Sequence, residues 1–361
     1  MFDKVIGQVR VKRILENIHK SNRLAHAYIF YGKEGTGKDA MAIEFACLVN
    51  GEPPDANMFH NRNFNFITAL PAGGDSDENE DPLLSLDKGD FDLYRSEIEK
   101  KSDDPYHKIL IPKANNIRIN SIRYIKKNIY LTGSEGKKKI YLISDADKMS
   151  PQSANALLKI LEEPPRNSLL LLTTSRLNSL LPTIIGRCQS IKFDDIPASM
   201  LVDYILDTYS DISREEAILY ANLSEGSISI CNAIMESNTL MLRDKVLSIL
   251  ISLLSGKNLE LSDEIGYIIA LKDKDAFKSF FSIMLLWFRD LSLERNSTED
   301  YIVNLDKLDR IKKFNSKFHF NYYEIVLSIE NAMRELDMNI NKELTMYNLF
   351  YTLRSQIVLK S

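Results

Sequence analysis

The chain has 361 residues, enough for two or three domains, and its 44% hydrophobic and 27% charged content is typical of a globular protein. Its formal net charge of -4 excludes a general attraction to nucleic acid, so any DNA contact must be local. Cys47, Cys188 and Cys231 lie far apart, which argues against a disulfide framework and fits a reducing cytoplasm. The first residues lack the apolar core of a signal peptide, and the most apolar segment, residues 280–288, is too short to span a bilayer.

The first predicted elements are a short turn at Ile6-Gly7-Gln8 and an amphipathic helix within residues 5–23. Its apolar residues recur at helical spacing, while basic residues occupy the rest of its surface. The apolar face consists of Val11, Ile14, Leu15 and Ile18.

A glycine-rich loop follows at residues 32–39, with the sequence Gly-Lys-Glu-Gly-Thr-Gly-Lys-Asp. It fits the P-loop pattern G-x-x-x-x-G-K-[ST] at every fixed position except the last. Residues 26–31 predict a buried strand before it and residues 40–46 a helix after it, which is the context that the motif needs. The pattern therefore predicts a nucleotide-phosphate site formed by backbone N–H groups, a helix N-terminus and one ammonium group. Its residues are Gly32, Gly35, Thr36, Gly37, Lys38 and Asp39.

Asp39 occupies the position at which a P-loop has a hydroxyl residue that binds Mg²⁺. A carboxylate can also bind Mg²⁺, but it repels the phosphates as well. It can equally be an acidic residue of the first helical turn that points away from the site. The sequence leaves these alternatives open.

Residues 51–105 are less regular. Residues 63–67 predict a strand, and the acidic run at residues 75–81 predicts a mobile loop. Asn120 or Ser121 is expected to cap a helix that carries basic residues. These residues can face nucleic acid or form a solvated helix face, and the second explanation is the commoner one. They are Arg123, Lys126 and Lys127, followed in the next loop by Lys137, Lys138 and Lys139.

Residues 140–143 predict a buried strand that ends in Ser144-Asp145-Ala146-Asp147, where acidic residues at the strand end can meet a metal–phosphate site. Ser150 and Pro151 are typical of a helix start. Residues 169–174 and 190–193 predict two more strands. Strands that alternate with helices predict an α/β domain with a doubly wound, mainly parallel sheet.

After Pro197 only helical periodicity remains. Ser213 and Glu216 have the spacing of a capping box. A later stretch has more apolar surface than one amphipathic stripe needs, so its side chains either pack within the domain or contact a partner. They are Phe277, Phe280, Phe281, Met284, Trp287 and Phe288.

These elements, in this order, resemble the clamp-loader subunits of bacterial DNA polymerase III, a group of AAA+ proteins. Ile6-Gly7-Gln8, His26-Ala27 and the P-loop match the start of the family's sequences, and residues 155–165, Asn-Ala-Leu-Leu-Lys-Ile-Leu-Glu-Glu-Pro-Pro, match its most distinctive stretch. Gly186-Arg187-Cys188 lies where the family has Ser-Arg-Cys, and residues 336–353, with Asn339-Ile340-Asn341, resemble its C-terminal helices. The resemblance covers most of the chain and is weakest between residues 52 and 112.

The resemblance implies three parts: a RecA-like AAA+ domain at residues 1–195, a small helical lid at residues 196–239 and an all-helical collar at residues 240–361. It also implies a cytoplasmic hetero-oligomeric ring of five subunits that uses ATP to open a sliding clamp and place it on primed DNA. The implied partners are gamma/tau-like and delta-like subunits and, through the complex, the clamp and primer-template DNA, with no membrane. The stator subunit of such rings is a poor ATPase that completes a neighbour's ATP site.

Departures from the family's motor subunit favour the stator. The motor's Walker B pair, Asp-Glu, falls on Ser144 and Asp145, and its sensor-2 arginine falls on Ser229. Thr174 or Ser175 remains as a sensor-1 hydroxyl. The four-cysteine zinc module of many relatives is absent, so no zinc is expected. ATP or ADP, with Mg²⁺ if bound, remains a possible ligand of a degenerate ATPase site.

The family resemblance also implies that Arg187 acts in trans, as an arginine finger on the ATP of the next subunit. Its planar, permanent charge suits a γ-phosphate. Two other hypotheses remain: an active motor ATPase of the same family, against which Ser144 and Ser229 argue, and an unrelated P-loop enzyme such as a nucleoside kinase. The second would not explain residues 155–165 or the long helical tail.

Overall fold

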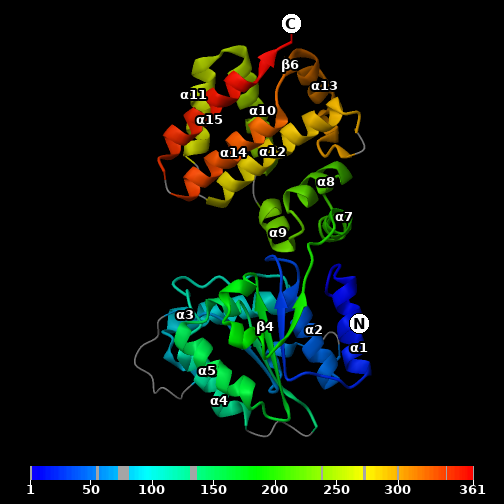
Figure 1. Ribbon diagram of the computed structural model, residues 1–361, viewed down its shortest axis with the longest axis vertical. Coiled ribbons are helices and arrows are strands. Elements are labelled where there is room, and N and C mark those ends of the chain that lie inside the picture. The colour runs from blue at the N-terminus through cyan, green and yellow to red at the C-terminus, as the bar shows by residue number, and fades with distance from the viewer. Residues whose placement is uncertain are drawn as a thin grey trace. The chain divides into compact units, whose positions relative to one another are not determined.

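The computed structural model describes residues 2–53, 57–71, 81–130, 136–236, 239–270, 274–298, 301–338 and 340–360. The chain forms two compact units (Figure 1). The first contains Met1–Met200 and Gly226–Ser229, and the second contains Leu201–Glu225 and Ile230–Ser361. The three-part division at residues 195 and 239 stays a prediction. The predicted acidic loop, up to residue 80, and Asn339 lie outside the described residues.

The first unit is built on a five-stranded sheet in the order β2-β3-β4-β1-β5. Every pair of neighbouring strands is parallel. The predicted α/β class with a parallel sheet is therefore confirmed. The strands are β1 (Ala27–Tyr31), β2 (Phe64–Ile67), β3 (Lys139–Ile143), β4 (Ser168–Thr174) and β5 (Gln189–Lys192).

The register brings the carboxyl ends of the central strands to one edge of the sheet. Tyr31, the last residue of β1, lies opposite Thr174 of β4, and Ile143, the last residue of β3, lies opposite Leu172 of β4. Because parallel strands end at the same edge, the segments that follow β1 and β3 meet there. The P-loop follows β1, and Ser144 follows β3.

Helices cover both faces of the sheet, as a doubly wound fold requires. Phe45 of α2 packs edge-on against Tyr28 of β1 on one face. On the other face, Ile125 of α4 and Leu157 of α5 belong to the same buried cluster as Ile29 of β1. Since β1 is buried on both faces, its sequence is continuously apolar rather than alternating. The helices are α1 (Val9–Lys20), α2 (Lys38–Asn50), α3 (Lys88–Asp103), α4 (Ile119–Ile129), α5 (Pro151–Glu162) and α6 (Pro182–Ile185).

The predicted helix starts are partly correct. The Ser150 side chain caps α5, whose first residue is Pro151, as expected. The prediction that Asn120 or Ser121 caps α4 is wrong, because the helix already begins at Ile119 and Arg118 is its N-cap without a side-chain hydrogen bond.

The second unit is almost entirely helical. The capping box of Ser213 and Glu216 is present at the start of α8. The expectation of helices alone is wrong in one detail, because β6 (Phe318–His319) and β7 (Val358–Leu359) form a short antiparallel pair. The helices are α7 (Ala198–Thr208) and α9 (Ile228–Glu236), which both start in the first unit, α8 (Arg214–Leu223), α10 (Thr239–Ser255), α11 (Asn258–Ile269), α12 (Lys274–Arg295), α13 (Leu308–Lys317), α14 (Tyr322–Asp337) and α15 (Lys342–Gln356). Within the described ranges, no helix is long and apolar enough to cross a membrane.

The aromatic stretch of α12 forms the core of this unit. The six side chains that were candidates for partner contact are each at most 5% exposed. Phe280 packs edge-on against Phe350 of α15, and Phe288 against Phe320. These apolar side chains therefore pack within the domain, and a partner must use other residues.

Candidate functional site

The glycine-rich loop between β1 and α2 has the backbone conformation that its sequence predicts. Gly35 and Gly37 have φ values of 74° and 88°, in the left-handed region that favours glycine. Other segments also approach both residues closely. A Cβ at Gly35 would lie 2.1 Å from the Ser227 Oγ, and one at Gly37 would lie 3.0 Å from the Tyr106 hydroxyl. Both positions therefore require glycine.

Lys38, the P-loop lysine, is turned onto its own loop. Its Nζ donates hydrogen bonds to the carbonyl oxygens of Gly32 (2.9 Å) and Lys33 (2.6 Å), and the residue is 8% exposed. Burial lowers the pKa of the Lys38 ammonium below its usual value, although the nearby Asp39 and Asp145 carboxylates oppose that shift. A phosphate that binds here would have to compete with these two carbonyl oxygens.

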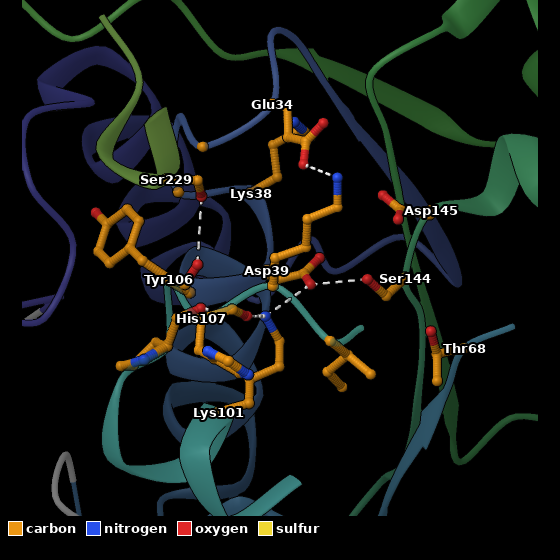
Figure 2. A pocket seen from close by; sticks show the side chains of 16 residues that line it. Glu34, Lys38, Asp39, Thr68, Lys101, Tyr106, His107, Ser144, Asp145 and Ser229 are labelled. Carbon is orange, nitrogen blue, oxygen red and sulfur yellow. Dashed lines mark hydrogen bonds and ion pairs between the residues drawn. The ribbon is translucent and has the colours of Figure 1, made fainter. Parts of the chain in front are cut away.

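The Asp39 carboxylate points into the site, toward the ends of β3 and β4 (Figure 2). Its Oδ2 accepts a hydrogen bond from the Ser144 Oγ at 2.7 Å, and its Oδ1 accepts one from the Thr173 Oγ1 at 2.6 Å. The Lys101 Nζ lies 3.1 Å from the Oδ2. The alternative in which Asp39 points away from the site is therefore excluded.

The environment of Asp39 favours its charged form. Burial alone would raise the pKa of this carboxyl. The charge of Lys101 and the hydrogen bonds from Thr173 and Ser144 outweigh burial and hold the pKa below its ordinary value. Asp39 is therefore a stable carboxylate with three donors around it.

Lys101, near the end of α3, was missed by the sequence analysis. Its side chain is 4% exposed. Besides contacting Asp39, its Nζ donates to the carbonyl oxygens of Pro105 (3.2 Å) and His107 (2.9 Å). It lies in the part of the chain where the family resemblance is weakest, and no motif marks it. A lysine in the last turn of an amphipathic helix is ordinarily a surface residue.

The two residues at the Walker B position differ in their contacts. Ser144 contacts Asp39, as described above. Asp145 has a φ of 51° and forms an ion pair with Lys148 at 2.8 Å. Both residues line the same cavity as Lys38 and Asp39.

The two threonines at the end of β4 have different partners. Thr173 donates to Asp39, whereas the hydroxyl of Thr174, the predicted sensor 1, donates to Asp147 at 2.7 Å. The structure therefore brings Thr173, rather than Thr174, to the P-loop carboxylate. Successive residues of a strand face opposite sides, so a shift of one position exchanges the two hydroxyls.

Two segments cover the P-loop. In the first, the Tyr106 hydroxyl accepts a hydrogen bond from the Ile6 N–H at 2.7 Å while the ring lies against Gly37. In the second, the Ile228 N–H donates to the Gly35 carbonyl at 3.0 Å, and the Ser229 Oγ donates to the Tyr106 carbonyl at 3.3 Å.

The remaining cavity measures about 70 Å³. Pockets that enclose small-molecule ligands measure roughly 300–1,000 Å³, so this cavity is small beside them.

Arg187 lies outside this cavity, between α6 and β5. Its guanidinium forms an ion pair with Glu162 at 2.8 Å and donates to the Thr183 carbonyl at 3.0 Å. Its side chain is 36% exposed. The structure therefore leaves Arg187 at the surface, apart from the chain's own P-loop.

The residues at the metal position do not fit a bound Mg²⁺. Mg²⁺ needs near-octahedral oxygen ligands and keeps several waters. The Asp39 oxygen that would bind it already accepts from Ser144 and faces the Lys101 ammonium. Among the described residues, no group of three or more His, Cys, Asp or Glu side chains is arranged to hold a metal ion.

Several known proteins are similar to this chain. The sequence model of the family described as "DNA polymerase III, delta subunit" matches residues 7–66 and 94–197. DNA polymerase III subunit delta' of Bacillus subtilis (strain 168) is 27% identical over 355 residues, which cover 96% of both chains. DNA polymerase III subunit tau/gamma of Haemophilus influenzae is 32% identical over 233 residues, which cover 63% of this chain and 29% of that protein. A solved DNA polymerase III gamma-subunit-related protein from Thermotoga maritima aligns with a TM-score of 0.43 at 20% identity, over 95% of this chain and 99% of that one.

The alignments therefore differ in how much of each relative they cover. The chain spans nearly the full length of the B. subtilis protein but less than a third of the H. influenzae protein.

Glu97 of α3 holds the segment that covers the P-loop. Its carboxylate accepts hydrogen bonds from Lys100 (2.8 Å) and the Leu110 N–H (2.9 Å), and the His107 Nε2 lies 2.9 Å away. Burial alone would raise the pKa of this carboxyl, but the hydrogen bonds from Lys100, Leu110 and His107 outweigh it and lower the pKa to about 2.

We expect Glu97→Gln to reduce the free energy of unfolding in a pH-dependent way. Because the folded-state pKa lies below the ordinary value of about 4.3, the Glu97 charge stabilises the fold fully above that value. This stabilisation is lost as the pH falls toward about 2. Urea unfolding of the wild type and the variant between pH 6 and pH 3.5 should show a difference that shrinks with acidity. Glu99→Gln, at a 70% exposed position on the same helix, is the control. A difference that stays constant with pH would contradict this assignment.

Proposed function

Because this chain belongs to the clamp-loader family of AAA+ proteins, we propose that it is a delta-prime-like stator subunit of a DNA polymerase III clamp loader. In this role it helps to load the sliding clamp onto primed DNA and completes the ATP site of a neighbouring subunit. A role in chromosome replication is consistent with a location in the cytoplasm. The observation on which the non-catalytic role rests is the engagement of Asp39 by Lys101, Ser144 and Thr173 at the metal position of the P-loop.

The alternative is an active motor ATPase of the gamma/tau type. A motor must position Mg²⁺ with a Walker B carboxylate and must stabilise the charge that develops on the phosphates. Here the first carboxylate is replaced by Ser144, and Asp145 is paired with Lys148. Ser229, at the sensor-2 position, provides no positive charge. These three positions favour the stator over the motor.

We propose that the chain's own site holds ATP or ADP weakly at most and does not turn ATP over at a useful rate. The loop amides and Lys38 can bind phosphate, but Lys38 is engaged by two carbonyl oxygens and the cavity is small. Steady-state ATP turnover by the purified chain should not exceed that of its Lys38→Ala variant. Robust turnover that Lys38→Ala abolishes would favour the motor alternative instead.

We propose that Arg187 contacts the ATP of the neighbouring subunit. Its ion pair with Glu162 is half-exposed, and such a pair contributes about 0–1 kcal/mol. Arg187 can therefore leave Glu162 for a γ-phosphate at little expense. In GTPases an arginine of this kind contributes roughly 10³–10⁵ in rate. We expect a smaller effect in a ring with several sites, because only one site borders this subunit.

The Arg187→Ala variant should enter the clamp-loader complex normally but should impair clamp loading and abolish ATP turnover at one site. The measurements are DNA-stimulated, clamp-dependent ATP turnover and clamp loading by the assembled complex. Arg13→Ala, at an exposed position on α1 in the same unit, is the matched control. Unchanged loading and turnover in a fully assembled Arg187→Ala complex would leave Arg187 with only its ion pair to Glu162.

We propose that residues 1–195 are the AAA+ domain, that residues 196–239 are the lid, and that residues 240–361 form the collar through which the subunit contacts its gamma/tau-like and delta-like partners. The buried side chains of α12 are not available for these contacts. Leu344 and Tyr351 of α15 are available, since they are 57% and 61% exposed. They are seven residues apart, which places them on one face of the helix.

The double variant Leu344→Glu/Tyr351→Glu should fold, because both side chains are exposed, but should enter the reconstituted complex at least about tenfold more weakly. The measurement is the mass of the assembled complex across a titration of this subunit. Leu259→Glu on α11, at an 86% exposed position, is the control. Undiminished assembly of the double variant would exclude this face as the contact surface.

A further inference from the structure

Two residues stand at the positions from which a P-loop ATPase binds Mg²⁺: Asp39 after the P-loop lysine, and Ser144 after β3. In this chain they are hydrogen-bonded to each other at 2.7 Å. The Lys101 ammonium lies 3.1 Å from the Asp39 Oδ2 (Figure 2). A protein cation therefore faces the group that would otherwise face the metal.

The Lys101 ammonium has no donor left for another ligand. An ammonium has three N–H donors. Here they face one carboxylate oxygen, of Asp39, and two carbonyl oxygens, of Pro105 and His107. These are the hard oxygen ligands that Mg²⁺ prefers, and the side chain is only 4% exposed. The ammonium is thus buried and contacted by three oxygen atoms.

We infer that the Lys101 ammonium takes the place of the divalent cation in this P-loop, so that the site keeps its closed form without Mg²⁺. Any nucleotide that enters would gain no affinity from Mg²⁺, unlike the ligand of a catalytic P-loop. This inference concerns the chain's own site and holds whether or not Arg187 acts on a neighbour.

The charges at the site are consistent with an ammonium in place of Mg²⁺. Relative to a catalytic P-loop, the carboxylate is absent at Ser144 and present instead at Asp39, which leaves a single negative charge between them. The Lys101 ammonium balances that charge without a metal ion. If Mg²⁺ bound to Asp39, Lys101 would keep only two carbonyl partners in a buried position. Leaving a buried charge without its partner is strongly unfavourable.

The same ammonium also closes the site. By binding the carbonyl oxygens on both sides of Tyr106, it fixes the segment whose tyrosine ring lies against Gly37. The Glu97 carboxylate holds the far end of this segment at the Leu110 N–H. Lys100 and Lys101 are neighbours on α3, the first outside the site and the second inside it. Lys100 is 56% exposed and contacts Glu97 instead of Asp39, so its substitution is a matched control for that of Lys101.

The test compares the melting temperature of the full chain for the wild type, Lys101→Met and the control Lys100→Met. Each is measured in EDTA and in millimolar MgCl₂, alone and with ADP. Lys101→Met keeps most of the side-chain stem but removes the charge. In EDTA it should melt on the order of 10 °C below Lys100→Met. Mg²⁺ should recover part of that loss in Lys101→Met and should leave the wild type unchanged, with or without ADP.

Three results would overturn the inference: a wild type that Mg²⁺ stabilises, a Lys101→Met variant as stable in EDTA as Lys100→Met, or a destabilised Lys101→Met that does not respond to Mg²⁺. The last result would make the pair an ordinary buried ion pair. If Lys101→Met does not fold in EDTA, the double variant Asp39→Asn/Lys101→Met decides. It removes both charges and should fold with no response to Mg²⁺, whereas a failure to fold would show that Lys101 does not act through Asp39.

Discussion

The first unit depends on one ion pair, between Asp39 at the start of α2 and Lys101 near the end of α3. Breaking a buried pair of this kind by removing one partner typically costs about 3–5 kcal/mol, because the other charge is left uncompensated. The pair also connects segments that share no motif. Asp39 reaches β3 and β4 through Ser144 and Thr173, and Lys101 reaches the segment around Tyr106 through two carbonyl oxygens. The P-loop, two strand ends and the covering segment are therefore held as one assembly.

The parallel register of the sheet makes this assembly possible. Because β1, β3 and β4 end at the same edge, a carboxylate on the first turn of α2 can reach a hydroxyl after β3 and another within β4. In a catalytic P-loop the same convergence gathers the ligands of a metal ion. Here it gathers two hydroxyl groups and a carboxylate, which together with Lys101 satisfy one another without a ligand.

The sequence was sufficient to predict the elements that a local pattern specifies, and it failed where tertiary contacts decide. The P-loop, the strands and the helix start at Ser150 follow from glycines, apolar runs and capping residues, and the structure has them. The contact of Lys101 with Asp39 joins residues 62 positions apart and leaves no periodic trace in either segment. Thr173 was missed because one position decides which side of a strand a hydroxyl faces. The buried aromatic residues of α12 could not be assigned from sequence, since a core residue and a contact residue have the same apolar character.

A cation that is a side chain of the protein, unlike a bound metal ion, cannot dissociate from its site. Switch segments of nucleotide-driven proteins order and disorder because the γ-phosphate and its Mg²⁺ come and go. A site whose cation is a side chain, and whose covering segment is tied to that side chain, loses this source of conformational change. In the proposed role, the first unit would then keep one shape while neighbouring subunits cycle through ATP, which is the property that a stator needs. Arg187 is held outside this assembly by a half-exposed ion pair. In the proposed stator role, a rigid site and a readily released arginine would be complementary: the first fixes the frame, and the second remains available to a neighbouring subunit.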